Sequence, residues 1–166
     1  MARTAPTDLE RDGWERGLRH IVGVDEAGCG PVAGPVVAAA VVLSPFRRAP
    51  RRLQGVNDSK LLTADKREAL AGEIREVAVA CVVAAASARE IERLNIRRAT
   101  ALAMRRAVER LPLVPDLMLF DGLPVPELCP HEAIFKGDTR CISIACASIV
   151  AKVTRDRLME LLDQRY

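Results

Sequence analysis

The sequence predicts an α/β domain with one central mixed sheet flanked by helices. Short apolar runs bounded by glycine or proline indicate buried strands, and they alternate with longer segments that have helical periodicity and N-terminal caps. At 166 residues the chain is long enough for one domain or most of one. A hydrophobic fraction of 49% with only 3% aromatic residues indicates a packed core of mainly Ala, Val, Leu and Ile.

Apolar runs place the expected strands at 20–24, 36–43, 78–86, 116–120 and, as a short strand, 131–135. Thr63 is the expected N-cap of a helix that continues to Val77. Ser87, with Glu three positions later, forms a capping box for the next helix. The order of strands and helices along the chain is typical of an α/β protein with one mixed sheet.

Asn95 is expected to break the helix that follows Ser87 and to cap a further helix over 96–111. The arginines of that helix are predicted on its outer face, where a solvated surface is preferred over nucleic-acid contact. The last expected helix covers 143–162, where apolar residues recur at helical spacing.

Residues 1–18 are polar and charged. We expect a flexible leader or a short helix around Trp14, followed by the domain at 19–166. The N-terminus lacks the apolar core of a signal peptide, and no apolar run is long enough to span a bilayer. We therefore expect a cytoplasmic protein without a membrane partner. The net charge of +3 permits an anionic partner but does not demonstrate one.

Two adjacent carboxylates, Asp25 and Glu26, end the first predicted strand. Neighbouring side chains of a regular strand point to opposite faces, so both acids can serve one site only if the strand ends or bends there. Gly28 and Gly30 permit such a bend, and they let a ligand approach the main chain closely.

Asp121 and Asp138 also stand beside a glycine at or just after a strand end. A single Asp-Gly pair is more simply interpreted as a turn. However, open α/β sheets place their sites at strand ends. We therefore expect Asp121 and Asp138 at the same edge of the sheet as Asp25 and Glu26. Gathered carboxylates repel one another unless they are protonated or bridged by cations. Their oxygens suit Mg²⁺ or Mn²⁺, and two such ions can promote phosphoryl transfer.

The first glycine-rich stretch resembles the signature of ribonuclease HII, which usually reads Asp-Glu-Ala-Gly-Arg-Gly-Pro. Here it reads Asp25-Glu26-Ala27-Gly28-Cys29-Gly30-Pro31. Further blocks resemble the family in the family's order: Asp58-Ser59-Lys60, 92–104, Asp121-Gly122, Lys136-Gly137-Asp138 and 143–157. The resemblance covers about residues 19–166 and departs from the family at its centre, where cysteine replaces arginine.

The resemblance implies the ribonuclease H-like fold and an endonuclease. Its substrates would be the RNA strand of RNA–DNA hybrids and single ribonucleotides embedded in duplex DNA, cut to leave 5′-phosphate and 3′-hydroxyl ends. It assigns two Mn²⁺ or Mg²⁺ ions to Asp25, Glu26, Asp121 and Asp138. Asp156 also matches a family position, but its helical setting favours a salt bridge or a helix contact over metal ligation. We expect a monomer.

The resemblance also assigns substrate contacts. Main-chain groups of Gly28, Cys29 and Gly30 would meet the 2′-hydroxyl at an RNA–DNA junction, since that hydroxyl distinguishes RNA from DNA. Lys60 would bind a phosphate, although an ordinary loop lysine fits the same position. With Cys29, main-chain contacts survive, whereas a phosphate contact from the family's arginine does not.

Two other functions are compatible with parts of the sequence. The glycines after Asp25 superficially resemble a dinucleotide-binding loop, but a strand follows them where a helix is required. A catalytically impaired module that binds RNA–DNA hybrids is the second.

Family members usually continue beyond the position of Tyr166 to a His-Lys-Gly-Tyr block whose tyrosine stacks at the junction. Because no residue here matches that tyrosine, we expect the chain as given to be weakly active or inactive, with poor preference for the junction.

Overall fold

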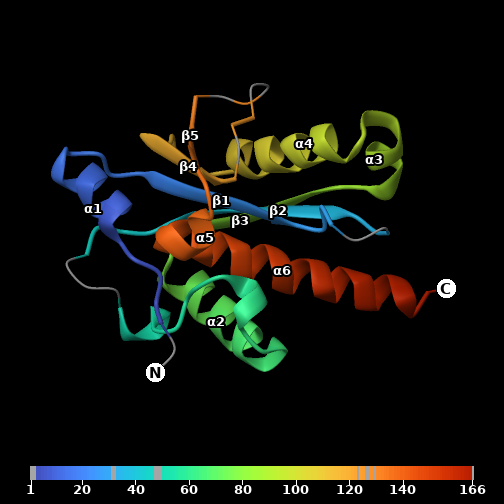
Figure 1. Cartoon of the computed structure of the whole chain (residues 1–166), viewed down its shortest axis with the longest axis horizontal. Coiled ribbons are helices and arrows are strands. Elements are labelled where there is room, and N and C mark those ends of the chain that lie inside the picture. Colours follow the sequence, from blue (N-terminus) through green and yellow to red (C-terminus); the bar gives the residue numbers. More distant parts are fainter. Residues whose placement is uncertain are drawn as a thin grey trace.

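The computed structural model describes residues 3–30, 33–46, 50–122, 124–125, 128 and 130–165. Within them a five-stranded sheet, in the order β3-β2-β1-β4-β5, lies between two layers of helices (Figure 1). The strands are β1 (Ile21–Ala27), β2 (Val36–Val42), β3 (Ala80–Ala86), β4 (Leu117–Asp121) and β5 (Glu132–Ile134). Strand β1 pairs antiparallel with β2 and parallel with β4, which makes the sheet mixed.

The helices divide between the two faces of the sheet (Figure 1). They are α1 (Asp8–Glu15), α2 (Ala64–Val77), α3 (Ala88–Leu94), α4 (Ile96–Glu109), α5 (Gly137–Arg140) and α6 (Ile142–Asp163). Two short 3-10 helices cover Arg51–Leu53 and Ser59–Leu61. Helices α3 and α4 lie on one face, and α2, α5 and α6 lie on the other.

Successive side chains of β1 point to opposite faces of the sheet, where each face has its own hydrophobic core. Val22 and Val24 are fully buried in the core on the α4 side. Gly23, between them, faces α6, and a Cβ atom there would lie 2.2 Å from the carbonyl carbon of Ser143. Only a residue without a side chain therefore allows the first turn of α6 to rest directly on the central strand.

The helix starts agree with the sequence prediction. Thr63 caps α2 by accepting from the backbone nitrogen of Lys66, and Ser87 and Glu90 form both hydrogen bonds of a capping box. Asn95 separates α3 from α4 with φ of 68°, and its side chain accepts from the nitrogen of Arg98. These local signals are confirmed because each depends on residues within one turn.

The strand ends differ more from the prediction than the helix starts do. Strand β1 continues to Ala27, beyond the expected 20–24, and β3 begins at Ala80 rather than at residue 78. Helix α5 and the two 3-10 helices were not predicted. Pro31 and Tyr166, singled out in the sequence, lie outside the described residues.

The segment ahead of β1, left open as a flexible leader or a short helix, contains helix α1, which includes Trp14. Its Glu10 is fully buried. The Oε1 atom of Glu10 accepts hydrogen bonds from the backbone nitrogen and the hydroxyl of Ser143. Helix α1 is thus tied to the start of α6. None of the helices in the described part of the chain has the length and apolar character needed to cross a bilayer.

Candidate active site

Three aspartates from different parts of the chain meet at one edge of the sheet. Val24 of β1 and Phe120 of β4 are paired in parallel register, so the next residues, Asp25 and Asp121, end neighbouring strands side by side. Asp138 joins them from α5. A carboxylate oxygen from each of the three lies within 4.8 Å of the others. Asp25 and Asp138 are buried, which places the cluster in the protein rather than on an open surface.

A tight turn brings Asp138 to this cluster. Lys136 adopts a left-handed conformation with φ of 53°, and Gly137 begins α5. The backbone nitrogen of Gly137 donates a hydrogen bond to Oδ1 of Asp121. A Cβ atom at Gly137 would lie 2.6 Å from Cδ1 of Ile144, so the turn has no room for a side chain there.

Glu26 borders the three aspartates without joining them. Strand β1 continues through Glu26 to Ala27, so its side chain points to the face opposite that of Asp25. Among the described residues, the group of carboxylates within 4.8 Å of one another does not include Glu26. Its carboxylate is nevertheless close to both Asp25 and the thiol of Cys29, and although burial raises its pKa, hydrogen bonding to each of them lowers it.

Burial makes these acids poor anions. It raises the pKa of Asp25 well above its ordinary value, and the charges of Glu26 and Asp121 raise it further. Burial also raises the pKa of Glu26, partly offset by the hydrogen bond from Cys29. The pKa of Asp138 is raised to about 6 by burial and by the charge of Asp121. Ionising several buried carboxylates side by side is unfavourable unless a cation neutralises them. Their oxygen atoms are suitable ligands for a hard divalent cation.

All of the predicted site residues line one hollow of about 340 Å³. They are Asp25, Glu26, Gly28, Cys29, Gly30, Lys60, Asp121 and Asp138. The hollow thus places acids, the glycine-rich turn and a lysine within reach of one ligand. Ser59, Ser148, Lys152 and Arg155 also line it.

Arg155 was not predicted as a site residue. It is buried, and its guanidinium donates to the carbonyl oxygens of Pro35 at 3.0 Å and Ala33 at 2.9 Å. Gly28 has φ of 109°, and a Cβ atom there would lie 2.4 Å from Nε of Arg155. Arg155 therefore holds the glycine-rich turn against α6. The available signal was an arginine within a helix that is otherwise largely buried.

Ser148 and Ser59 fix the position of the Lys60 segment. The hydroxyl of Ser148 donates to that of Ser59 at 3.0 Å, which ties this segment to α6. The backbone nitrogen of Lys60 donates to Oδ1 of Asp58 at 2.9 Å. Ser148 was interpreted as a plain helix residue, and its described contact joins two parts of the protein.

Asp156 forms the salt bridge that its helical setting predicted. Its Oδ1 lies 2.7 Å from Nζ of Lys152, and Oδ2 lies 4.0 Å from Arg67. Asp156 is absent from the group of clustered carboxylates in the described part of the chain. It is therefore a suitable control for substitutions of the clustered acids.

Cys29 is an exposed thiol beside the acids. Its Sγ lies 3.0 Å from Oγ1 of Thr100 on α4. Partial burial and the charge of Glu26 raise the pKa of Cys29 to about 12, so the thiol stays neutral at ordinary pH. This position contributes no positive charge to a phosphate.

Comparison with known proteins identifies relatives of the chain. The sequence model of the family Ribonuclease HII matches residues 22–166. Ribonuclease HII of Myxococcus xanthus is 53% identical over 162 residues, which cover 95% of this chain and 53% of the relative. Ribonuclease HII of Delftia acidovorans is 56% identical over 147 residues, or 88% of this chain and 61% of the relative. The chain thus spans between half and two thirds of the length of these relatives.

Solved structures show the same fold. The crystal structure of ribonuclease H2 from Pyrococcus horikoshii OT3 superposes with a TM-score of 0.76 at 31% identity, covering 89% of this chain and 77% of that one. Bst-RNase HIII in complex with Mn²⁺ has a TM-score of 0.76 at 23% identity, over 89% of this chain and 55% of that one. These neighbours confirm the ribonuclease H-like fold that the sequence resemblance implied.

Proposed function

The chain belongs to the ribonuclease HII family, and from this we propose that it is a metal-dependent endonuclease that hydrolyses the RNA strand of RNA–DNA hybrids. The observation that carries the proposal is the cluster of Asp25, Asp121 and Asp138 in one hollow with the glycine-rich turn and Lys60. The finer form of the proposal includes cleavage at single ribonucleotides in duplex DNA, with 5′-phosphate and 3′-hydroxyl products.

The clustered acids fit divalent cations. Asp25, Asp121 and Asp138 would hold two Mg²⁺ or Mn²⁺ ions, with Glu26 at the border of the cluster. When bound, such ions supply an activated water and stabilise the leaving 3′-oxygen. Burial, with added repulsion from neighbouring acids, raises the pKa of Asp25 and of Asp138, and a bound cation would offset both effects, which supports this assignment.

The chain's own groups would select and hold the substrate. In the proposal, main-chain groups of Gly28, Cys29 and Gly30 meet the 2′-hydroxyl, the group that distinguishes RNA from DNA. Arg155 supports this role because it packs against Gly28 and donates to the carbonyl oxygens of Ala33 and Pro35, which follow the turn. Lys60, at the rim of the same hollow, would orient a phosphate as a point charge.

A second candidate is a hybrid-binding module with little catalytic activity. It is favoured by Cys29, which stands where the family has arginine and remains neutral. The clustered aspartates favour the nuclease, since binding alone requires no buried carboxylates.

Cleavage of two substrates tests the proposal: a uniform RNA–DNA hybrid and a DNA duplex with one ribonucleotide. Each is incubated with Mg²⁺ or Mn²⁺, and the product ends are mapped. We expect the parent to cut both slowly, Asp138→Asn to lose most of that activity, and Asp156→Asn to retain it. Binding without cleavage would support the hybrid-binding module. Cleavage by Asp138→Asn at the parent's rate would remove Asp138 from the proposed ligands.

A further inference from the structure

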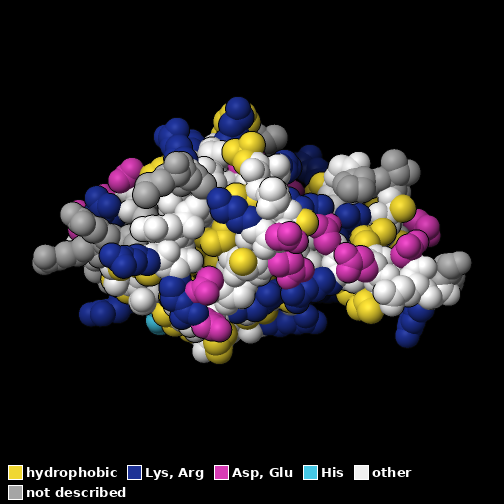
Figure 2. All heavy atoms as spheres, turned by 90° about the horizontal axis from the view of Figure 1, so that it is seen from below, with side chains coloured by type: hydrophobic (Ala, Val, Ile, Leu, Met, Phe, Trp, Pro, Cys, Tyr) yellow, Lys and Arg dark blue, Asp and Glu magenta, His cyan; other side chains and the backbone are white. Residues whose placement is uncertain are grey.

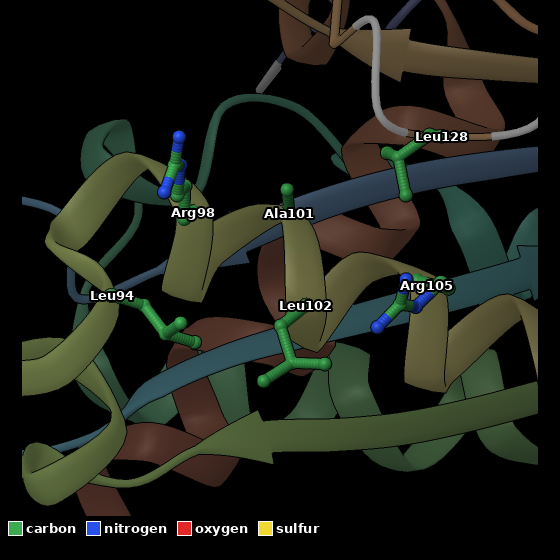
Figure 3. Close-up of a pocket in the computed structure, with 6 residues that line it drawn as sticks. All are labelled: Leu94, Arg98, Ala101, Leu102, Arg105 and Leu128. Carbon is green, nitrogen blue, oxygen red and sulfur yellow. The ribbon is translucent and has the colours of Figure 1, made fainter.

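A second hollow lies along the outer side of α4, away from the acids. It has a volume of about 180 Å³ and is lined by Leu94, Arg98, Ala101, Leu102, Arg105 and Leu128. Figure 3 shows Arg98 and Arg105 on either side of Ala101 and Leu102 along the helix. The floor is therefore apolar and its two ends are positively charged.

This hollow is linked to the candidate active site by a third hollow that borders both. Ala101 also lines this third hollow of about 480 Å³, which includes Arg97. Glu26, Cys29 and Asp121 line that third hollow and the acidic one alike. Shared walls thus connect the acids to the outer side of α4. We call the surface formed by Arg97, Arg98, Ala101, Leu102 and Arg105 the α4 track.

The arginines of the α4 track are available to bind an anion. Among the described residues, no carboxylate lies within 4.0 Å of the side chain of Arg97 or Arg98. Arg105 has only Glu109 at 3.9 Å, in an exposed pair, and such pairs are weak. Arg106, on the same helix but off the track, is held by Glu90 at 2.6 Å.

Arginines on the opposite face of the molecule differ in this respect. Arg52 is paired with Glu73 and Glu76, and Arg157 is paired with Glu68. Figure 2, which presents the side that is lowest in Figure 1, shows basic and acidic side chains intermixed there. Arg52 and Arg157 thus have carboxylate partners that Arg97 and Arg98 lack among the described residues.

The spacing of the arginines suits a nucleic-acid strand. Arg98 and Arg105 are separated by seven positions of α4, or about 10.5 Å along the helix axis. A strand of a duplex rises about 3.4 Å per nucleotide, so this separation corresponds to roughly three phosphates. One guanidinium group can bind two oxygens of a phosphate through two parallel hydrogen bonds. Leu102, between the two arginines, offers an apolar surface to the sugars of the strand.

We propose that the α4 track binds the phosphodiester backbone of one strand of a duplex whose neighbouring segment lies at the acidic cluster. The inference rests on the proposed function, because the acids determine which duplex is bound. Adjacency to the acidic hollow, through the residues that the hollows share, favours a nucleic-acid strand over an acidic protein segment as the occupant. The strand would pass Arg97 on leaving the acids and then reach Arg98 and Arg105.

The test compares two double variants that each remove two positive charges. Arg98→Gln/Arg105→Gln alters the α4 track, and Arg52→Gln/Arg157→Gln alters the opposite face. Binding of a labelled RNA–DNA hybrid is measured in chelator, so that nothing is cut, at salt concentrations from about 50 to 200 mM. Thermal unfolding establishes that both variants are folded.

We expect the track variant to bind at least tenfold more weakly at low salt. Its plot of log affinity against log salt should be shallower by about 1.8, since each lost phosphate contact removes about 0.9 from the slope. The control should keep the parent's slope. Equal slopes for parent and track variant, or equal losses in both variants, would overturn the inference. A parent that neither binds nor cuts the hybrid would instead refute the proposed function. Binding of polyglutamate, as a model of an acidic protein segment, is measured in the same way. If the track variant loses polyglutamate binding but binds the hybrid as the parent does, the occupant is a protein segment and the inference is overturned.

Discussion

The Oε1 atom of Glu10 lies 2.8 Å from the backbone nitrogen of Ser143 and 2.7 Å from its hydroxyl, although the two residues belong to opposite ends of the chain. The thiol of Cys141 donates to the same oxygen at 2.9 Å. Ser143 is in the first turn of α6, where backbone N–H groups have no partner within the helix. A carboxylate is also favoured there by the helix dipole. Helix α1 therefore fixes the helix that carries Ser148 and Arg155.

Glu10→Ala should lower the free energy of unfolding by about 1–3 kcal/mol, because it leaves buried donors at the start of α6 without an acceptor. Denaturant titration measures the loss. Glu15→Ala is the matched control, since Glu15 is exposed on the same helix and should change stability little. A Glu10→Ala protein as stable as the parent would show that α1 does not support α6.

Gly23→Ala and Gly72→Ala should have opposite effects. At Gly23 the new methyl would lie 2.2 Å from the backbone of Ser143, so α6 must move and stability should fall by about 1–3 kcal/mol. At Gly72, in the middle of α2, nothing lies within 4 Å of the new methyl. Alanine there should stabilise by about 0.5–1 kcal/mol through its helix propensity. Unfolding midpoints of the same sign for both variants would contradict this account of the packing.

The stability of the metal-free protein should fall as pH rises through the acidic range. The pKa of Asp138 is raised from 3.8 to about 6, so the folded state binds more protons than the unfolded chain between these values. Its stabilising contribution is complete below 3.8 and is lost as pH passes about 6. In Asp138→Asn, the fall of melting temperature across this window should be shallower.

Thermal unfolding in chelator at a series of pH values measures this dependence. Asp156→Asn is the control, because its carboxylate is in a salt bridge with Lys152 outside the cluster. It should keep the parent's pH dependence. A profile of Asp138→Asn that coincides with the parent's would show that Asp138 does not titrate in this window.

Cys29→Arg, which restores the family's residue, should tighten binding of an RNA–DNA hybrid several-fold at low salt. Cys29 is exposed beside the acidic hollow, so a guanidinium there can reach a phosphate. The gain should shrink as salt increases, because the added contact is electrostatic. Affinities of Cys29→Arg and the uncharged control Cys29→Gln are compared at low and high salt in chelator. Equal affinities would show that only the main chain of this turn contributes.

Much of the fold could be predicted because its signals are local. The caps at Thr63, Ser87 and Asn95 each depend on a residue three positions later, and all are confirmed. The role of Glu10 could not be predicted in this way. Its partner Ser143 is 133 positions away, and no local pattern indicates which residue lies at the start of a distant helix.

The site was predictable as far as sheet geometry determines it. Asp25 and Asp121 end neighbouring strands, and the structure brings them together through the parallel pairing of β1 and β4. The separation of Glu26 from the three aspartates depends on where β1 ends, which composition specifies only to within a few residues. Arg155 was missed because its partners are carbonyl oxygens of a loop more than a hundred positions away.

The strict alternation along β1 has a consequence for how the chain tolerates change. Asp25 leaves the strand on the face covered by α6 and Glu26 on the face covered by α4, although both side chains line the acidic hollow. A one-residue insertion or deletion between Ile21 and Val24 would exchange those faces while leaving both acids in the sequence. A chain can therefore keep every residue of the signature and still lose the site. Strand register, as much as residue identity, therefore determines whether Asp25 lies beside Asp121 and Asp138 in this chain.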